Sequence, residues 1–458
     1  MSRARQLHRA LAWVAAVTAA AWATSGALHP LIVAIGPKPV AFQPQHTSFE
    51  AAAVSAPAEL LAKVGIAEAS QLRYVAVDGR PALQVLPVGA GERRYLDAAS
   101  GQLIAGADQA RAIALARHYS GEQTATVRDV RLVERFDRDY PWINRLLPVW
   151  AVAFEGEAGV RVYVDTGGDR LGTMSGASKR YWQSLFQTLH TLSFIEVPYL
   201  RPAAVGLMVG VLLATAVFGS ALLLRRGGSQ PGRRFHRRLA YLALLPALLF
   251  PATGLFKLLV GQLPYTPPPQ PPAIAAGTLT APPFAAGDGA LLEAVAIPLR
   301  DSAAVWRVVL AQGEETAIRL RGADGSVLDG DDSLLAQRIA GTVFGQPVAE
   351  PLTELRRFDR DYGFANKRLP VWKAAGPDGR DWYFETRSGL VAAQIGGLPQ
   401  LQAQVFDLLH KGQLFNRLGL SLGQRDLLMS TLAGLVVLTA LLGLRLRLRR
   451  RRPVDQQR

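Results

Sequence analysis

Hydrophobic and polar positions divide the chain into four long apolar runs and two longer stretches of mixed pattern. The apolar runs cover about residues 10–33, 202–224, 238–262 and 427–444. Each run is close to the roughly 20 residues that a helix needs to cross the hydrocarbon core of a bilayer. The first run has the basic start and Ala-rich core of a signal peptide. A matching run at 238–262 lies in mid-chain, so we interpret both as membrane helices.

The stretches 36–200 and 263–425 contain shorter patterns that alternate between helical and extended types. In the first stretch, helices are expected at 57–65 and 108–119, each followed by three strand-like runs. In the second, a Pro-dense linker precedes helices expected near 287–296 and 332–344, again among strands. The sequence therefore predicts an αβββ unit twice in each stretch and an α+β membrane protein.

A repeat at a fixed offset connects the two halves of the chain. Residues 135–150 read RFDRDYPWINRLLPVW, and residues 357–372 read RFDRDYGFANKRLPVW, at an offset of 222. Further matches follow in the same order at offsets of 220 to 228: His8 with His236, Ser25 and Gly26 with Thr253 and Gly254, His190 with His410, and Gly206, Gly210, Thr215 and Gly219 with Ser430, Gly434, Thr439 and Gly443. An offset of nearly half the chain indicates duplication of a domain-sized unit.

Positive charge gathers in the three short pieces outside the apolar runs. The formal net charge is +15, and arginines concentrate in residues 1–9, 225–237 and 445–458. By the positive-inside rule these pieces are cytoplasmic, and both long stretches lie on the far side of the membrane. The basic composition is therefore a signal of topology, with the lipid bilayer as partner, and it does not indicate nucleic-acid binding.

Composition also limits the chemistry. The chain has no cysteine, which excludes disulfides, thiolate metal sites and covalent haem attachment. It has no nucleotide-binding Gly motif, and the cytoplasmic pieces are all shorter than twenty residues. A flavin or nicotinamide site is therefore not expected, and any electrons must come from quinol or a separate reductase.

Several of these features together resemble a known family. An αβββ unit that ends in a hairpin such as YVDTGGDRL resembles the PepSY domain. With four helices, a His-Arg start to the first and third, and a Leu-His before the second and fourth, the chain resembles the PepSY-associated transmembrane (PepSY_TM) family over nearly its full length. The resemblance implies a multi-pass protein of a Gram-negative inner membrane with large periplasmic regions. Its relatives resemble ferric-siderophore reductases of iron uptake, some of which carry b-type haem.

Histidines are the candidate cofactor ligands. His8 and His236 begin the first and third helices, whereas His190 and His410 precede the second and fourth. A haem without cysteine attachment needs axial imidazoles from facing helices. His29 lies 21 residues after His8 and is matched by Lys257, so one helix could offer an imidazole near each membrane face. We expect one or two haem b groups, an inner one served by His8 and His236 and an outer one for which His29, His190 and His410 compete.

Ordinary interpretations remain open for these histidines. A His beside Arg at a helix end can meet lipid phosphate, and an interfacial His can anchor an amphipathic segment. The remaining two, His46 and His118, are unmatched and expected on the solvent side.

The repeated RFDRDY has two interpretations. In a strand, Arg135, Asp137 and Asp139 would share one face, and the stretch would form an ion-paired joint between neighbouring αβββ units. Alternatively it binds a polar or metal-chelate ligand through the carboxylates and hydroxyls of Asp137, Tyr140, Asp359 and Tyr362.

The leading hypothesis is a transmembrane electron conduit that reduces a ferric siderophore or another periplasmic acceptor, as a haem-dependent oxidoreductase. Two alternatives remain: an envelope protein without enzymatic activity whose PepSY units bind or restrain a peptide or protein, and an anchor subunit of a larger complex.

Overall fold

The computed structural model describes residues 3–44, 47–51, 53–224, 231–299, 302–313, 315–348 and 350–448. The chain forms two compact units. A helical unit comprises Met1–Gly36, Ser178–Tyr265 and Gly397–Arg458, and a sheet unit comprises Pro37–Ala177 and Thr266–Gly396. Both units contain segments from both halves of the chain.

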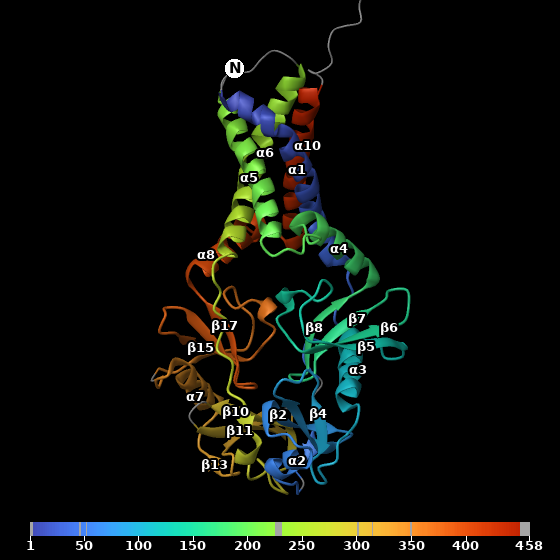
Figure 1. Ribbon diagram of the computed structural model, residues 1–458, viewed down its shortest axis with the longest axis vertical. Coiled ribbons are helices and arrows are strands. Elements are labelled where there is room, and N and C mark those ends of the chain that lie inside the picture. The colour runs from blue at the N-terminus through green and yellow to red at the C-terminus, as the bar shows by residue number, and fades with distance from the viewer. Residues whose placement is uncertain are drawn as a thin grey trace, which may run out of the picture. The chain divides into compact units, whose positions relative to one another are not determined.

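Four long helices form the body of the helical unit (Figure 1): α1 (Arg3–Ile35), α5 (Leu200–Leu223), α6 (Pro231–Val260) and α10 (Leu422–Leu448). All four are long and apolar enough to cross a membrane, as the apolar runs predict. Four shorter helical segments complete the unit: α4 (Ala177–Thr191), α8 (Gly397–Val405), η4 (Phe406–His410) and α9 (Gln413–Arg417).

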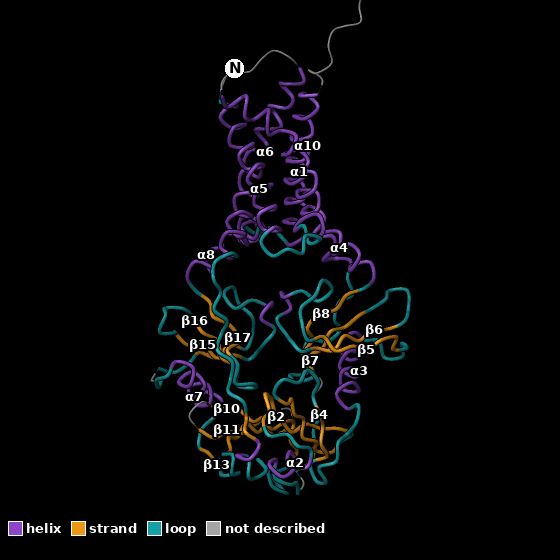
Figure 2. Tube along the Cα trace, viewed as in Figure 1, coloured by secondary structure: helices purple, strands orange, loops and turns teal. Residues whose placement is uncertain are grey.

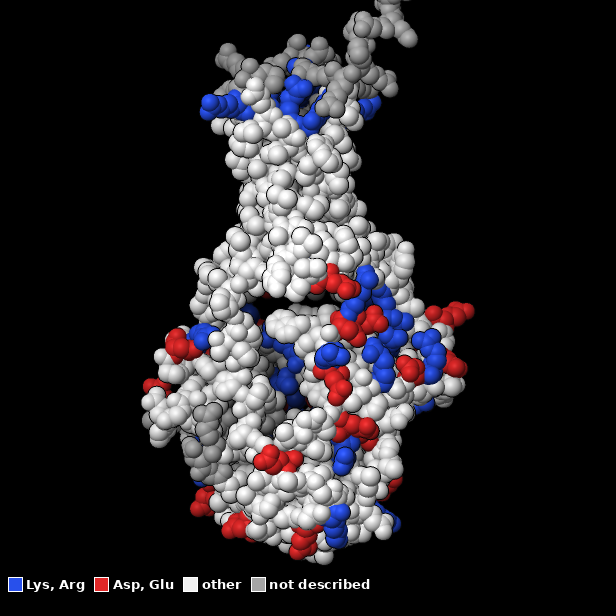
Figure 3. Space-filling view, viewed as in Figure 1, with Lys and Arg blue, Asp and Glu red and all other residues white. Residues whose placement is uncertain are grey.

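The four long helices pack as an antiparallel bundle in which α1 and α6 occupy opposite corners, because each packs mainly against α5 and α10. Arg447 Nη1 donates to the carbonyl of Ala10 at 3.2 Å, and Arg237 Nη2 donates to that of Leu223 at 3.0 Å. The start of α1 and the end of α10 therefore lie together, as do the end of α5 and the start of α6, at one end of the bundle. Figure 3 shows Lys and Arg at this end and a band without charged side chains along the helices. We call it the basic end and the opposite one the far end.

The basic end is only partly described. The arginines at 225, 226 and 449–452, on which the predicted topology also depends, lie outside the described residues.

The sheet unit is built around one nine-stranded sheet to which both halves contribute (Figure 2). Its main path runs β13-β12-β11-β10-β2-β3-β4, with β10 antiparallel to β2, and two short strands, β1 and β9, pair with β10 and β2. The first half supplies β1 (Phe49–Glu50), β2 (Glu68–Val77), β3 (Arg80–Pro87) and β4 (Arg94–Asp97); the second supplies β9 (Ile274–Ala275), β10 (Ala290–Leu299), β11 (Ser302–Gln312), β12 (Glu315–Arg321) and β13 (Val327–Leu328). One face buries Tyr74, Phe284 and Trp306 in a shared core with α2 (Pro57–Lys63) and the short η2 (Ala276–Thr278) nearby.

Two four-stranded antiparallel sheets, one from each half, complete the sheet unit. The first consists of β5 (Val127–Val133), β6 (Val149–Phe154), β7 (Arg161–Asp165) and β8 (Arg170–Ser175), and the second of β14 (Thr353–Leu355), β15 (Val371–Ala375), β16 (Asp381–Phe384) and β17 (Val391–Ile395). α3 (Ala107–Ser120) packs on the first and α7 (Asp332–Phe344) on the second.

The ends of α7 illustrate how local sequence sets these elements. The Asp331 carboxylate accepts from the backbone N–H groups of Ser333 and Leu334 and caps the helix, and Gly345 ends it at φ 69°. The helices predicted at 57–65, 108–119 and 332–344 are confirmed.

One predicted helix is wrong. Residues near 287–296 form most of β10, a central strand that pairs with both β11 and β2. Its Ala, Leu and Glu residues favour a helix by intrinsic propensity, but the strand is buried along nearly its whole length. A short apolar run of this kind cannot be assigned by periodicity alone, and pairing on both sides overrides propensity. The expectation of an αβββ unit twice in each half therefore fails at this position.

The repeated RFDRDY stretch is also not a strand. In both copies it is a loop that leads into a 3-10 turn, η1 (Trp142–Asn144) and η3 (Phe364–Asn366), and then into the next strand. Each turn ends in a left-handed residue, Arg145 or Lys367. The expected alternation of faces is absent because the Asp at the third position closes a turn and does not extend a strand.

Candidate functional site

The four repeat-matched histidines lie in the helical unit, two at the basic end of the bundle and two at the far end. His8 is in α1 and His236 is in α6, in the part of each helix at the basic end. His190 ends α4 against α1, and His410 ends η4 against α6. Because α1 and α6 occupy opposite corners, each pair draws its imidazoles from opposite sides of the bundle interior.

At the basic end the imidazoles face matched glycines. His8 Nδ1 donates to the carbonyl of Thr215 in α5 at 3.0 Å. A Cβ at Gly219 would lie 3.1 Å from His8 Cε1, and a Cβ at Gly443 would lie 3.2 Å from His236 Cε1. These glycines therefore provide the space for the two rings.

The anchoring of His236 is looser than that of His8. Its Nδ1 is buried and makes no hydrogen bond of normal geometry within the described residues. The carbonyl of Thr439, at the position that matches Thr215, is its neighbour.

At the far end a hydroxyl replaces the carbonyl as the anchor of His190. His190 Nδ1 lies 3.0 Å from Ser25 Oγ, and that hydroxyl donates its own proton to the carbonyl of Trp22 at 3.0 Å. Ser25 can therefore only accept from the ring, so His190 carries its proton on Nδ1 and leaves the Nε2 lone pair free.

His410 repeats this arrangement on α6. Its Nδ1 lies 3.0 Å from Thr253 Oγ1, and Thr253 donates to the carbonyl of Leu249 at 2.6 Å. Next to each anchor stands a glycine: Cβ atoms at Gly26 and Gly254 would lie 3.5 Å and 3.8 Å from the Cε1 atoms of the two rings. The same residue pattern, hydroxyl then glycine, thus holds both imidazoles.

Burial keeps these two imidazoles neutral. Desolvation lowers the pKa of His190 to about 4, and the nearby His29 contributes. Desolvation likewise lowers the pKa of His410 to about 4, followed by repulsion from His190 and from the ammonium groups of Lys257 and Lys411. Neutral imidazole with a free Nε2 is the form that binds metal.

Aromatic rings support the far-end pair. Phe186 stacks on His190 with centroids 4.7 Å apart, and Phe406 stacks on His410 at 4.3 Å, each one helical turn before its histidine. Along α1, the 17 residues from His8 to Ser25 correspond to about 26 Å, which matches the span of a hydrocarbon core of about 30 Å. The two pairs therefore lie near opposite ends of the apolar band.

His29 differs from the other four. Its ring is exposed, lies 4.9 Å from that of Phe186 and makes no hydrogen bond with any described residue. It also faces none of the matched glycines. The structure therefore distinguishes His29 from the four repeat-matched histidines, each of which lies beside a matched glycine. Of the other two histidines, His46 lies outside the described residues, and His118 Nε2 donates to the carbonyl of Gln43 at 2.8 Å.

The anchored imidazoles have the properties expected of axial haem ligands. Metal-bound histidines usually donate their second ring N–H to a protein oxygen, which fixes tautomer and orientation, and three of the four do so here. The matched glycines leave room beside each ring. Within the described residues no three His, Asp or Glu side chains gather to hold a bare metal ion, but a haem needs only two axial ligands.

The residues considered for ligand binding in RFDRDY are engaged within their own loops. The Asp137 carboxylate accepts from Tyr140 N at 2.6 Å, and the buried Tyr140 hydroxyl donates to the carbonyl of Leu146 at 3.0 Å. Asp359 and Tyr362 make the same two contacts at 2.6 Å and 3.0 Å. These contacts favour the structural interpretation.

The expected ion-paired joint takes a different form. The ion pairs of Asp137 with Arg131 and of Asp139 with Arg161 stay within one sheet. The two repeated loops contact each other through their 3-10 turns, where Arg145 Nη1 donates to Asn366 Oδ1 at 2.8 Å.

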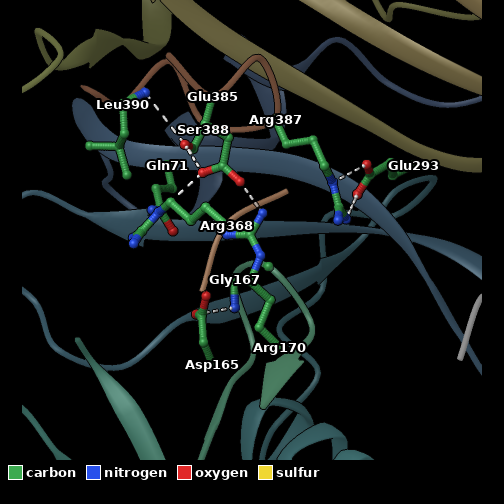
Figure 4. Close-up of a pocket in the computed structure, with 11 residues that line it drawn as sticks. Gln71, Asp165, Gly167, Arg170, Glu293, Arg368, Glu385, Arg387, Ser388 and Leu390 are labelled. Atoms are coloured by element: carbon green, nitrogen blue, oxygen red, sulfur yellow. Dashed lines mark hydrogen bonds and ion pairs between the residues drawn. The ribbon is translucent and has the colours of Figure 1, made fainter. Parts of the chain in front are cut away.

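A charged pocket lies where the turn after β7 meets the turn after β16 (Figure 4). Glu385, fully buried, pairs with Arg170 from the first half and with Arg368 Nε at 3.2 Å. The pocket has room for about one water molecule. It therefore has no space for a chelate, and its guanidinium groups are already paired with the carboxylates of Glu385 and Glu293.

Beside this pocket, a second buried carboxylate joins the halves. Glu293 pairs with Arg387 at 3.0 Å and with Arg73 at 3.3 Å, and Arg73 also pairs with Asp169 at 3.0 Å. Burial alone would raise the pKa of Glu293, but Arg387 and Arg73 outweigh it and lower the pKa to about 2. Arg73 and Arg111 likewise hold the pKa of the buried Asp169 well below its usual range.

Sequence reasoning noted the Ser25-Gly26 and Thr253-Gly254 match but assigned it no part in the site, and it missed Phe186 and Phe406. The shared FxxxH spacing before both histidines was the available signal. A scan against protein-family models finds no match, and no curated protein matches the sequence.

Proposed function

We propose that the chain is an inner-membrane protein of the PepSY_TM type that holds one or two haem b groups and conducts electrons to a periplasmic acceptor, a ferric chelate or another oxidant. The observation that carries this proposal is the set of anchored imidazoles, each from a different helical segment and each beside a matched glycine or threonine.

The residues have distinct roles in this proposal. His8 and His236 would hold the inner haem, and His190 and His410 would hold the outer one. Haem b, when bound, supplies reversible one-electron chemistry at its iron. Ser25 and Thr253 fix the tautomer and direction of the outer imidazoles. His29 lacks such an anchor, so we assign the outer site to His190 and His410.

The proposal includes the topology and origin of the chain. Both termini and the α5–α6 connection are cytoplasmic, and 36–200 and 263–425 are periplasmic PepSY-like regions that arose with the helices by duplication. The basic end of the bundle and the offset matches support this orientation. Electrons come from quinol or a separate reductase.

The test is an absorbance spectrum of the purified full-length protein, air-oxidised and then reduced with dithionite. We expect a Soret band and a reducible α band. His8→Ala and His190→Ala should each remove part of the spectrum, whereas His118→Ala in the sheet unit should leave it unchanged. A protein expressed with ample haem that lacks these bands would end the conduit proposal.

A second candidate function rests on the sheet unit. The touching turns η1 and η3 expose Trp142, Ile143 and Phe364 together, with Arg145 and Lys367 over the two aromatic rings. This surface suits a peptide or protein partner, in an envelope protein without enzymatic activity or an anchor subunit. Two results together would favour this second function: the unaltered chain shows no haem spectrum, and it binds a peptide or protein partner that Trp142→Ala no longer binds.

A further inference from the structure

The two halves differ at one position beside the far-end pair. Position 257 in α6 matches position 29 in α1 at the offset of 228, but one residue is Lys257 and the other is His29. Their surroundings nevertheless correspond. The His29 ring lies 4.9 Å from the ring of Phe186, and Lys257 Nζ lies 4.3 Å from the centroid of Phe406.

These phenylalanines are the rings that stack on the proposed ligands, Phe186 on His190 and Phe406 on His410. The Phe406 ring therefore contacts both Lys257 and His410, the imidazole that we assign to the outer site. The corresponding place in the other half holds the imidazole of His29 in place of an ammonium group.

Positive charge collects around His410. The ammonium groups of Lys257 and Lys411 lie 4.3 Å and 5.8 Å from the centroid of Phe406, the ring that stacks on His410. Lys411 is compensated by Asp407 at 2.7 Å. Lys257, in the last turn of the apolar helix α6, forms no ion pair with any acid in the described part of the chain. The helix dipole stabilises a cation in the last turn of a helix. This stabilisation does not explain why the Lys257 ammonium group lies over the ring of Phe406, beside His410.

We propose that Lys257, with His29 at the matched position, forms a carboxylate-binding pair at the far end of the bundle. The inference rests on the proposed function, because the bound carboxylates belong either to the propionates of the outer haem or to an anionic ligand that arrives at this end. If the carboxylates are the propionates, the Lys257 ammonium group would also stabilise the reduced form of the haem, which has one positive charge fewer than the oxidised form.

The experiment compares Lys257→Gln with Lys179→Gln in the full-length protein. Lys179 lies in the first turn of α4 in the same unit, so its replacement removes the same charge elsewhere. Redox titration without added ligand should show a tenfold less favourable reduction of one haem in Lys257→Gln, about 59 mV for one electron, and no change in Lys179→Gln. His29→Gln should keep the α band that loss of an axial ligand would remove.

A second arm uses citrate and ferric citrate, titrated by calorimetry into the same proteins. A normal potential with tenfold weaker citrate binding in Lys257→Gln assigns the site to a free ligand, and a lowered potential with unchanged citrate binding assigns it to the propionates. Unchanged potential and unchanged citrate binding overturn the inference and leave Lys257 as a side chain that reaches lipid phosphate. If the unaltered protein holds no haem, the proposed function fails, and the citrate arm alone decides the inference.

Discussion

Replacing Glu385 with glutamine should strongly destabilise the sheet unit, because this carboxylate is the ion-pair partner of two largely buried guanidinium groups. Glu385 is fully buried, and its partners Arg170 and Arg368 expose only 11% and 15% of their side chains. Glutamine keeps the shape and can still accept from the Ser388 hydroxyl. Loss of one partner of a buried ion pair costs about 3–5 kcal/mol, a large part of the roughly 5–15 kcal/mol that stabilises a typical domain.

The matched control is Glu354→Gln. Glu354 pairs with Arg356, whose side chain is 80% exposed, and exposed pairs contribute about 1 kcal/mol or less. Urea unfolding of the detergent-solubilised chain, followed by tryptophan fluorescence, reports mainly on the sheet unit, which holds five of the eight tryptophans. With a urea slope of about 1–3 kcal/mol/M, a loss of about 3–5 kcal/mol should lower the Glu385→Gln midpoint by roughly 1–5 M.

A Glu385→Gln midpoint that coincides with that of Glu354→Gln would refute the reasoning. Replacing Arg170, Arg368 and Glu385 together by Met, Leu and Leu separates charge from packing. Because no charge is then left unpaired, this triple variant should be more stable than Glu385→Gln alone.

Three further outcomes follow from the same contacts. The pKa of the Glu293 carboxylate is lowered to about 2 in the folded chain, against about 4.3 in an unfolded chain. Its contribution to the free energy of unfolding is therefore complete above the unfolded pKa and should be lost as the pH falls from about 4.5 toward 2. Glu293→Gln should make the free energy of unfolding depend less on pH over this range. Gly219→Ala should crowd the ring that lies 3.1 Å away and weaken haem retention on the order of tenfold, whereas Gly26→Ala, with 3.5 Å of space, should not. Tyr140→Phe and Tyr362→Phe each remove one buried hydrogen bond and should cost equal amounts, about 1 kcal/mol each by urea unfolding; unequal costs would mean that the two loops are not equivalent.

The parts of the fold that the sequence predicts well are those set by local pattern. The apolar runs become α1, α5, α6 and α10 because a helix that crosses a bilayer must be apolar over its whole length. α7 also follows its local signals, with Asp331 before it and Gly345 after it. Such features require no knowledge of what packs against them.

The sequence fails where distant partners decide. Residues 290–299 form a strand because β2, more than 200 residues earlier, supplies its second edge. The buried network of Arg73, Asp169 and Glu293 could not be anticipated either, since charged residues read as exposed until their partners are known. For two acids that follow a strand at a hairpin end, the repeat was an available signal. Asp165 in YVDTGG and Glu385 in YFETRSG occupy matched places in the two halves, and both are buried.

Each structural unit depends on both halves of the chain in the same way. In the helical unit, each imidazole pair combines one residue from each half, His8 with His236 and His190 with His410. In the sheet unit, β2 and β10 join the halves into one sheet, and Glu293 and Glu385 pair with arginines of the first half. A single half would leave a strand edge unpaired and buried charges uncompensated, and it would supply only one imidazole to each proposed haem site. If the halves arose by duplication, each proposed two-imidazole site is a product of that event. Positions at which the halves differ, such as His29 and Lys257, are then the places where the two sides of a symmetric site could have diverged.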